Sequence, residues 1–351
     1  MSHMLEEIRR QPETLSRILD YGLRSAQVLQ TRFRAARPRF IVIAARGTSD
    51  NAAQFGRYLI EISTGIPVSL AAPSIVTLYR SHRDLGDALV VGISQSGEST
   101  DTNAVVADAR ERGAITVGIT NEPRSALAGI AEYTLLVRAG REESIAATKT
   151  YTGQLLVLYL LAAALGGSVE EERLRRIPEW VEAALGLDER IAGVAERYRF
   201  MTGTMTVGRG LNYANALEFG LKLMETCYVL ADGFSAADLL HGPIALVERG
   251  FPVFVFAPPG PTWPSISGVL DRLAELKADT LVIAGQGSPQ AQAQGRVIEV
   301  PVQPGFDDSA SDLYTPIPYI VPAQLFAARL AEVRGLDPDR PRTLTKVTRT
   351  L

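Results

Sequence analysis

Short apolar runs without charges recur along the chain, and each is followed by a stretch whose apolar positions have helical spacing. Uncharged runs of about five residues are typical of buried parallel strands, and a 3.6-residue spacing predicts helices between them. In the N-terminal half the strand-like runs are residues 40–45, 68–70, 88–92, 115–120 and 133–137. This alternation predicts an α/β domain with a mainly parallel sheet flanked by helices.

The same order of patterns begins again in the C-terminal half. Glu225 closes a predicted helix and follows Glu61, which closes its counterpart, by 164 positions. Leu281 in a predicted strand follows Val117 by the same interval. Two independent matches at one offset indicate an internal duplication, so we expect two domains of the same fold.

The length of 351 residues also exceeds what a single core usually supports. A charged stretch with helical spacing separates the two repeats and predicts a linker. The predicted parts are an N-terminal helical segment at 1–39, a first domain at 40–168, a helical linker at 169–198, a second domain at 199–336 and a C-terminal tail at 337–351.

The loop at residues 93–102, Ile-Ser-Gln-Ser-Gly-Glu-Ser-Thr-Asp-Thr, joins the strand at 88–92 to the next helix. It contains five hydroxyl residues, one amide and one glycine. A helix N-terminus presents backbone N–H groups and the positive end of the helix dipole, and hydroxyls add further donors. The loop therefore predicts a cradle for a phosphate monoester, and the alternative is a simple helix N-cap.

The corresponding loop of the second half, residues 257–263, reads Ala-Pro-Pro-Gly-Pro-Thr-Trp. Prolines lack the N–H donors that an anion needs. We therefore expect phosphate to bind only to the first domain, which leaves the second domain to supply other groups.

Composition excludes several classes of function. The formal net charge is −3 and no block of Lys and Arg stands out, which argues against a nucleic-acid partner. No apolar run reaches the roughly 20 residues that span a bilayer, and no secretory leader is visible. The single cysteine, Cys227, and three histidines without ligand spacing argue against a disulfide or a metal site. We expect a cytoplasmic protein with no cofactor and no membrane partner.

Three charged residues lie on a predicted helix at 215–229: Glu218, Lys222 and Glu225. Lys222 and Glu225 are three positions apart, so their side chains emerge on nearly the same face. One interpretation is an ordinary surface ion pair. The other is a carboxylate base, Glu225, that moves a proton between adjacent carbons while Lys222 stabilises an enolate-like oxygen.

Two further residues are candidates for chemistry. His241 is followed directly by Gly242 and Pro243, which fix a turn at its position. Lys346 lies in the C-terminal tail and could form an imine with a carbonyl substrate. Taken alone, such a histidine is more often structural, and a terminal lysine is more often exposed to solvent.

Six ordered motifs together resemble the sugar isomerase (SIS) superfamily, and especially the isomerase half of glutamine–fructose-6-phosphate aminotransferase. The motifs are Arg-Gly-Thr-Ser at 46–49, Ser-Gln-Ser-Gly-Glu-Ser-Thr-Asp-Thr at 94–102, Ala-Ala-Thr-Lys at 146–149, the two parts Ala-Leu-Glu and Leu-Lys-Leu-Met-Glu at 216–225, His-Gly-Pro at 241–243 and the tail at 340–346. The resemblance implies two SIS domains, each a flavodoxin-like three-layer sandwich, with the site at their junction.

The resemblance also implies which residues bind the substrate. Thr48 and Ser49 would line the sugar site, and Ile145 falls where the family makes a backbone contact to the sugar. The residues matching the family's phosphate site are Ser94, Gln95, Ser96 and Ser99. The chain departs from the synthase pattern at Ser99, where the synthase has threonine.

By the same resemblance, Glu225 matches the base that shuttles a proton between C1 and C2, and Lys222 its neighbouring helper. His241 matches a ring-opening histidine that reaches in from the other subunit of a homodimer. Lys346 matches the tail lysine that forms an imine with the open-chain ketose. Met224 departs from the pattern, because the synthase has lysine before the base.

The synthase also carries a glutaminase domain, whereas only residues 1–39 precede the first predicted strand here. Without channelled ammonia, mass action favours the reverse direction. We therefore expect a dimeric phosphosugar isomerase that converts glucosamine 6-phosphate to fructose 6-phosphate and ammonia. The alternatives are a deglycase acting on a fructosamine 6-phosphate and a sugar-phosphate sensor that does not turn over.

Overall fold

The computed structural model describes residues 2–81, 83–292, 295–301 and 311–346. The chain divides into two compact units. The first unit comprises residues 13–142, 149–171 and the tail from 344 onward. The second unit comprises the chain start up to residue 12, residues 143–148 and residues 172–343.

The first unit contains a five-stranded parallel sheet in the order β2-β1-β3-β4-β5. Its strands are β1 (Phe40–Ala44), β2 (Val68–Leu70), β3 (Ala88–Ile93), β4 (Ile115–Thr120) and β5 (Tyr133–Leu136). Every residue of β3 and β4 is buried, as their uncharged sequences predict for central strands covered on both faces.

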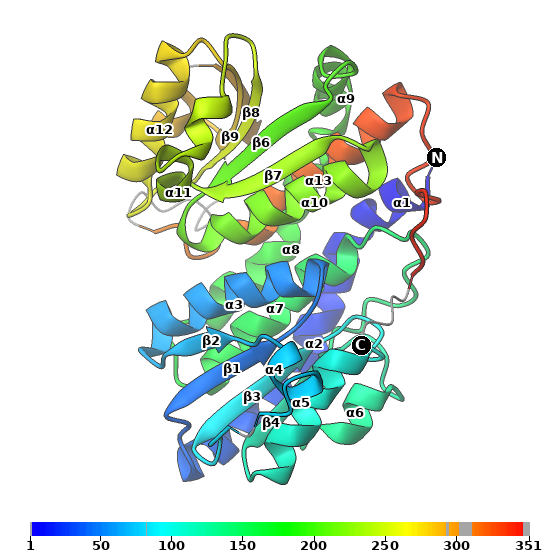
Figure 1. Cartoon of the computed structure of the whole chain (residues 1–351), viewed down its shortest axis with the longest axis vertical. Helices are drawn as coiled ribbons and strands as arrows, with labels where there is room; N and C mark the ends of the chain where they lie inside the picture. The colour runs from blue at the N-terminus through cyan, green and yellow to red at the C-terminus, as the bar shows by residue number, and fades with distance from the viewer. Residues whose placement is uncertain (1, 82, 293–294, 302–310, 347–351) are drawn as a thin grey trace. The chain divides into compact units, whose positions relative to one another are not determined.

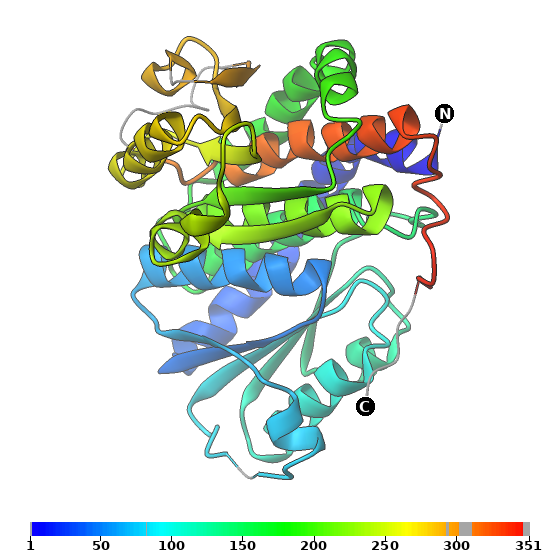
Figure 2. The same cartoon turned by 45° about the horizontal axis from the view of Figure 1, so that its top comes forward.

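Helices cover both faces of this sheet. On one face, α5 (Thr100–Glu111) packs Val105 and Ala109 against Val42 and Val90 of the strands. The helices α4 (Ser74–Thr77) and α6 (Ala126–Ile130) lie beside α5. The turned view of Figure 2 shows α3 (Thr48–Thr64) running across the other face.

Helix α7 (Lys149–Ala164) packs against α3, and its Tyr159 ring meets the Phe55 ring of α3 edge to face at a centroid distance of 5.1 Å. The long helix α2 (Gln11–Ala35) packs against α7 through Gly22, where an added Cβ would lie 2.5 Å from Leu160. The first unit therefore has helices on both faces of its sheet, as the alternating sequence pattern predicts.

The second unit repeats this plan, with its parallel strands in the order β7-β6-β8-β9-β10. Its strands are β6 (Gly203–Gly208), β7 (Leu230–Ser235), β8 (Pro252–Ala257), β9 (Asp279–Gly285) and β10 (Arg296–Val300). Numbered within each unit, both sheets have the order 2-1-3-4-5, which is the flavodoxin-like arrangement. The predicted α/β fold with two flavodoxin-like domains is thus confirmed.

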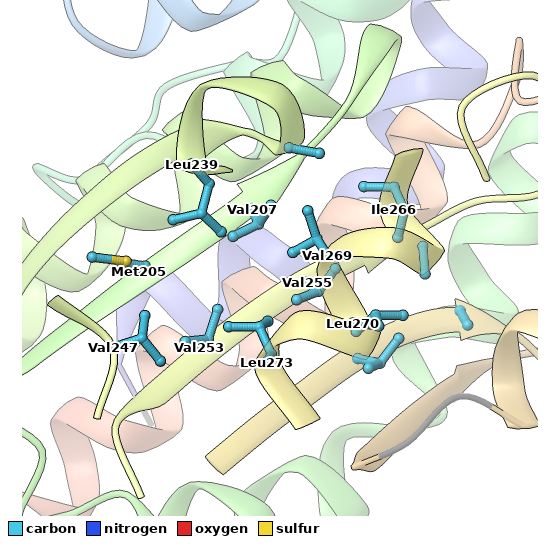
Figure 3. Packing of buried hydrophobic residues seen from close by; sticks show 14 residues of the cluster. Met205, Val207, Leu239, Val247, Val253, Val255, Ile266, Val269, Leu270 and Leu273 are labelled. Carbon is cyan, nitrogen blue, oxygen red and sulfur yellow. The ribbon is translucent and has the colours of Figure 1, made fainter. Parts of the chain in front are cut away.

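Two cores hold the second unit together. On one face, α11 (Ala236–Leu240) and α12 (Trp263–Glu275) cover the sheet, and Figure 3 shows Val269 and Leu273 of α12 packed beside Val253 and Val255. On the other face lie α10 (Tyr213–Cys227) and α13 (Pro316–Val333), drawn side by side in Figure 1. There the Phe254 ring of β8 meets the Phe219 and Phe326 rings at centroid distances of 5.1 and 5.0 Å.

The remaining helices complete the second unit and the linker region. They are α1 (His3–Arg9), α8 (Glu171–Leu185), α9 (Asp188–Arg197) and the 3-10 turns η1 (Gly210–Asn212), η2 (Pro243–Leu246) and η3 (Pro289–Gln292). Across the described ranges, no helix combines the length and the apolar character that a membrane crossing requires.

Helix α13 was not expected from the sequence pattern. It contains Pro318 and Pro322, and an internal proline removes a hydrogen bond and disfavours a helix. However, nearly every residue from Pro316 to Ala331 is buried, so α13 is apolar around its whole circumference. Burial on all sides outweighs the local propensity, and it also removes the one-sided spacing by which a helix is recognised.

We predict that Leu273→Ala, which empties a fully buried position between α12 and the sheet, destabilises the second unit by about 2–5 kcal/mol. Both tryptophans, Trp180 and Trp263, lie in this unit, so tryptophan fluorescence during urea unfolding reports on it. The control is Leu230→Ala, at a position 78% exposed, which should shift stability by no more than about 0.5 kcal/mol. Equal effects of the two substitutions would contradict this description of the core.

Candidate functional site

In the first unit the strand order reverses at the neighbouring strands β1 and β3, and we call the region between the loops that follow these two strands the crevice. The chain leaves β1 for α3 on one face and leaves β3 for α5 on the other, so the loops after these neighbouring strands diverge. In open α/β sheets ligands bind at this point, outside the carboxyl ends of the strands. The loops found here are residues 45–47 and 94–99, the second of which is the hydroxyl-rich loop.

Two serines of this loop are oriented by backbone donors. Ser94 Oγ accepts a hydrogen bond from the Gly97 N–H at 3.1 Å, and Ser96 Oγ accepts one from the Glu98 N–H at 3.2 Å. A hydroxyl that accepts from the backbone keeps its own proton for donation. Ser94 and Ser96 can therefore donate to an anion that enters the crevice.

Gly97 lets the loop turn tightly. Its φ of +68° lies in the left-handed region, and an added Cβ would lie 2.1 Å from Ser125 Oγ. Its carbonyl accepts hydrogen bonds from Asn103 Nδ2 and from the Leu127 N–H, both at 3.0 Å. Only glycine fits this position without displacing Ser125, the N-cap of α6.

An ion pair links the two loops of the crevice. Arg46 Nε donates to Asp101 Oδ2 at 2.6 Å, and the Asp101 side chain is almost fully buried in the first turn of α5. Burial alone would raise the pKa of the Asp101 carboxyl, but the hydrogen bonds from Arg46 and Ser99 outweigh it and lower that pKa below its usual value. Asp101 is thus ionised at neutral pH, and it ties the loop after β1 to the hydroxyl-rich loop.

The other predicted sugar and phosphate residues of this unit differ in what they can offer. Ser99 Oγ lies 2.9 Å from Asp101 Oδ1 and 3.0 Å from Thr102 Oγ1, so its hydroxyl serves the loop itself. Ser49 Oγ accepts from Gln154 Nε2 at 3.0 Å, which leaves its proton available to a ligand. Thr48 begins α3 at the crevice and is half-buried.

A pocket of about 450 Å³ lies in the first unit beside the hydroxyl-rich loop. Gln95 and Ser96 line it together with Lys346, which arrives from the far end of the chain. The remaining lining residues are Asn121, Glu122, Gly140, Arg141 and Glu142. The fold thus brings the predicted phosphate loop and the predicted tail lysine into one cavity.

The second unit contains a buried ionic group on α10. Lys222 Nζ lies 3.4 Å from Glu218 Oε1 and donates a hydrogen bond to Glu225 Oε2. The side chains of Lys222 and Glu218 are 1% and 0% exposed, whereas that of Glu225 is 22% exposed. The interpretation of Lys222 and Glu225 as a surface ion pair is therefore wrong, and of the two carboxylates Glu225 is the one that a ligand can reach.

The charge of Lys222 is fixed by its neighbours. Burial would lower the pKa of Lys222, but the carboxylates of Glu218 and Glu225 raise it above its usual value. Lys222 therefore stays protonated and cannot act as a base or a nucleophile near neutral pH. A buried ammonium beside an accessible carboxylate can stabilise negative charge that develops on a substrate oxygen.

His241 and Ile145 also belong to the second unit. His241 caps the C-terminus of α11 and is exposed. Ile145 lies in the segment 143–148, whose N–H groups at Glu143 and Ser144 donate to the buried Glu7 carboxylate at 2.5 and 3.3 Å. This clamp fixes the backbone that immediately precedes Ile145.

In the second unit the carboxylate of Asp312 lies in the corresponding region, between the loops that follow β6 and β8. Thr262, at the start of α12, donates its hydroxyl to Asp312 Oδ2 at 3.3 Å, and Asp312 also lies against Gly210 after β6. Burial raises the pKa of the Asp312 carboxyl. Phosphate binding by the first domain alone stays a prediction.

Two residues beside these sites were not identified from the sequence: Glu142, which contacts Lys346, and Gln154, which orients Ser49. The spacing on α10 did indicate Glu218 as an ionic partner, but not that its side chain is fully buried. Glu142 lies in a polar stretch that does not distinguish it from surface residues, and no local spacing relates Gln154 to Ser49. Among the residues that the structure describes, no group of three or more His, Cys, Asp or Glu is placed to hold a metal ion.

The family model of the SIS domain matches residues 36–164 and again residues 204–333. The chain is 37% identical over 352 residues to glutamine–fructose-6-phosphate aminotransferase (isomerizing) of Pyrococcus horikoshii. That match covers 98% of the chain but 57% of the relative, so the chain spans little more than half of that protein's length.

Solved structures match the chain along nearly its whole length. A Silicibacter pomeroyi protein, named provisionally as a phosphosugar isomerase, is 33% identical with a TM-score of 0.86, and the match covers 97% of this chain and 100% of that one. The glucosamine-6-phosphate deaminase of Thermotoga maritima has a TM-score of 0.76 over 99% of this chain and 100% of that one. At 24% identity, this second likeness shows a shared fold alone.

We predict that Asp101→Asn destabilises the protein by about 1–3 kcal/mol at pH 7, because it removes a charged partner from a buried hydrogen-bond group. The folded pKa of Asp101 is lowered, so its stabilisation is complete above the unfolded value of 3.8 and is lost as the pH falls through the folded value. Calorimetric Tm values at pH 7, 5 and 3 should show the difference from wild type shrinking only below about pH 4.

The control for this prediction is Asp87→Asn, which removes an exposed carboxylate 3.7 Å from Arg39. Exposed pairs contribute little, so this substitution should change Tm only slightly at every pH. A difference between wild type and Asp101→Asn that stays constant down to pH 3 would show that the Asp101 charge does not stabilise the fold.

Proposed function

The chain belongs to the SIS domain family, and we propose that it is a phosphosugar isomerase that deaminates glucosamine 6-phosphate to fructose 6-phosphate and ammonia. The observation that carries this proposal is the pocket shared by Ser96, Gln95 and Lys346. Hydroxyl and backbone donors suit a phosphate monoester, and a primary amine beside them suits a carbonyl or imine carbon of the same ligand.

In this proposal the phosphate of the sugar is held by Ser94, Gln95 and Ser96, while Ser99 shapes the loop through its contacts with Asp101 and Thr102. The sugar itself is held by Thr48, Ser49 and the backbone at Ile145. The case for phosphate binding is strongest for Ser94 and Ser96, because backbone N–H groups orient both hydroxyls as donors. Charge-assisted hydrogen bonds of this kind contribute more than neutral ones, so an unphosphorylated sugar should bind poorly.

The isomerisation requires a base that can reach two adjacent carbons. Glu225 would remove the proton from C2 of the open-chain aldose and deliver it to C1, so that the aldehyde becomes a CH₂OH group and the C2 amine becomes an imine. Lys222 would stabilise the negative charge that develops on the oxygen at C1. His241, reaching in from a second copy of the chain, would open the sugar ring before these steps.

Ammonia leaves in the last stage. Lys346 would attack the imine carbon at C2 and form its own imine there while ammonia departs. Water then hydrolyses the enzyme-bound imine, which yields the ketose and regenerates the lysine. Two likenesses support this proposal: the chain resembles isomerizing aminotransferases named for fructose 6-phosphate, and a protein named glucosamine-6-phosphate deaminase has the same fold.

The direct test is ammonia release from glucosamine 6-phosphate by the purified protein. We expect ammonia and fructose 6-phosphate in equal amounts, and neither product from glucosamine or from N-acetylglucosamine 6-phosphate. Absence of ammonia from all three, with release of an amino acid from a fructosamine 6-phosphate, would replace the proposal with a deglycase. Thermal stabilisation by the phosphorylated sugars without turnover would replace it with a sensor.

We predict that Glu225→Gln lowers kcat by about 10²–10⁴-fold, because a positioned general base contributes an acceleration of this size. KM should change little, since the phosphate loop lies in the other unit and is untouched. The matched control is Glu275→Gln, at an exposed position on α12, which should retain wild-type kcat. Full turnover by Glu225→Gln would rule out its role as the base.

We predict that Ser96→Ala raises KM for glucosamine 6-phosphate by about 10–100-fold, because one hydrogen bond to a charged phosphate is lost. Ser69→Ala, at an exposed position on β2, provides the control and should bind normally. The affinity for inorganic phosphate, measured by calorimetric titration, should fall in parallel with that for the sugar. Unchanged affinity for both ligands would exclude the loop as the phosphate site.

A further inference from the structure

The two carboxylates that line the pocket of the first unit have different environments. Glu122 is exposed, whereas the side chain of Glu142 is 0% exposed. A buried carboxylate is retained only where partners compensate for its lost hydration. The partners of Glu142 therefore indicate what this side chain does.

One side of Glu142 is fixed by helix α7. Thr150, in the first turn of α7, donates its backbone N–H to Glu142 Oε1 at 3.2 Å and its hydroxyl to Glu142 Oε2 at 2.6 Å. The helix dipole also favours a negative charge at this N-terminus. In addition, Lys149 Nζ donates to the carbonyl of Arg141 at 2.6 Å, which holds the backbone directly before Glu142.

The other side of Glu142 faces the C-terminal tail. Lys346 Nζ donates to Glu142 Oε2 at 3.4 Å, and the Lys346 side chain is 28% exposed. The tail from residue 344 groups with the first unit, although residues 172–343 group with the second. The tail segment that carries Lys346 therefore belongs to the same unit as Glu142.

We propose that Glu142 is the positioning residue of Lys346, and that its buried carboxylate holds Lys346 Nζ at the wall of the pocket beside Gln95 and Ser96. A free lysine side chain samples many rotamers, and fixing it has an entropic cost that a preorganised partner must offset. Thr150 and the start of α7 preorganise that partner. The kinetic part of this inference rests on the proposed function, but the contact itself does not.

The test measures the reactivity of Lys346 without any turnover. The chain contains four lysines, Lys149, Lys222, Lys277 and Lys346, of which the first two are buried and Lys277 is exposed. Reductive methylation with formaldehyde and a borane reductant, followed by mass spectrometry, gives the labelling rate of Lys346 relative to Lys277. We expect Glu142→Gln to raise this ratio about fivefold, because it removes the ion pair and keeps the shape of the side chain.

The matched control is Glu122→Gln, which makes the same charge change in the same pocket. It should leave the labelling ratio at the wild-type value, so a general effect of pocket charge is separated from the contact with Glu142. If Glu142→Gln does not fold, Thr150→Val serves instead, because it removes the hydroxyl that holds the carboxylate and should also raise the ratio. An unchanged ratio in a folded Glu142→Gln or Thr150→Val variant would overturn the proposal.

Kinetics supply a second readout that a purely structural role would not give. Glu142→Gln should lower kcat at least tenfold while KM stays within about twofold, because the phosphate loop is intact. Glu142→Asp, which keeps the charge, should recover part of the loss. If the wild-type protein releases no ammonia, the proposed function fails, while the labelling ratio still decides whether Glu142 positions Lys346.

Discussion

The right-handed connection between parallel strands is the constraint on which both units depend. Each crossover between parallel strands is right-handed. A chain that starts at a central strand, adds the next strand on one side and then crosses to the other side therefore places its first two crossover helices on opposite faces of the sheet. In the first unit this reversal occurs between β1 and β3, and in the second between β6 and β8. Each crevice follows from the topology, and the residues of the flanking loops decide what it can bind.

Buried charges give the two units their different chemistry. In the first unit Asp101 is compensated by Arg46, and the buried Glu142 is compensated by Thr150 and Lys346. In the second unit Lys222 is compensated by Glu218 and Glu225. Each group places one partner where solvent or a ligand can reach it, so the fold supports charges that a core without such partners would exclude.

The sequence predicts the strands of the first sheet well because its central strands are covered on both faces and are therefore uncharged runs such as 88–92 and 115–120. It does not identify β7 and β10, which contain charged residues and are only partly buried. It predicts the hydroxyl-rich loop because serine and glycine have specific uses where a strand turns into a helix. It does not predict α13, since a helix buried on all sides has no polar face to give the pattern a period.

The sequence also does not predict which residues contact the site residues. Glu142 is 204 positions from Lys346, and Gln154 is 105 positions from Ser49. Such pairs arise from tertiary packing, and no local spacing encodes them. The buried state of Lys222 is hidden for the same reason, because spacing on one helix shows that three charges share a face but not that the face is covered.

The most direct measurement of the central claim follows the hydrogen at C2 of the sugar. Glucosamine 6-phosphate deuterated at C2 is incubated with the protein, and the products are observed by NMR while ammonia is assayed. The account predicts that deuterium leaves C2 in step with ammonia release and that part of it appears at C1 of fructose 6-phosphate, carried there by one base. Recovered sugar that keeps its deuterium at C2, with no ketose formed, would contradict the account.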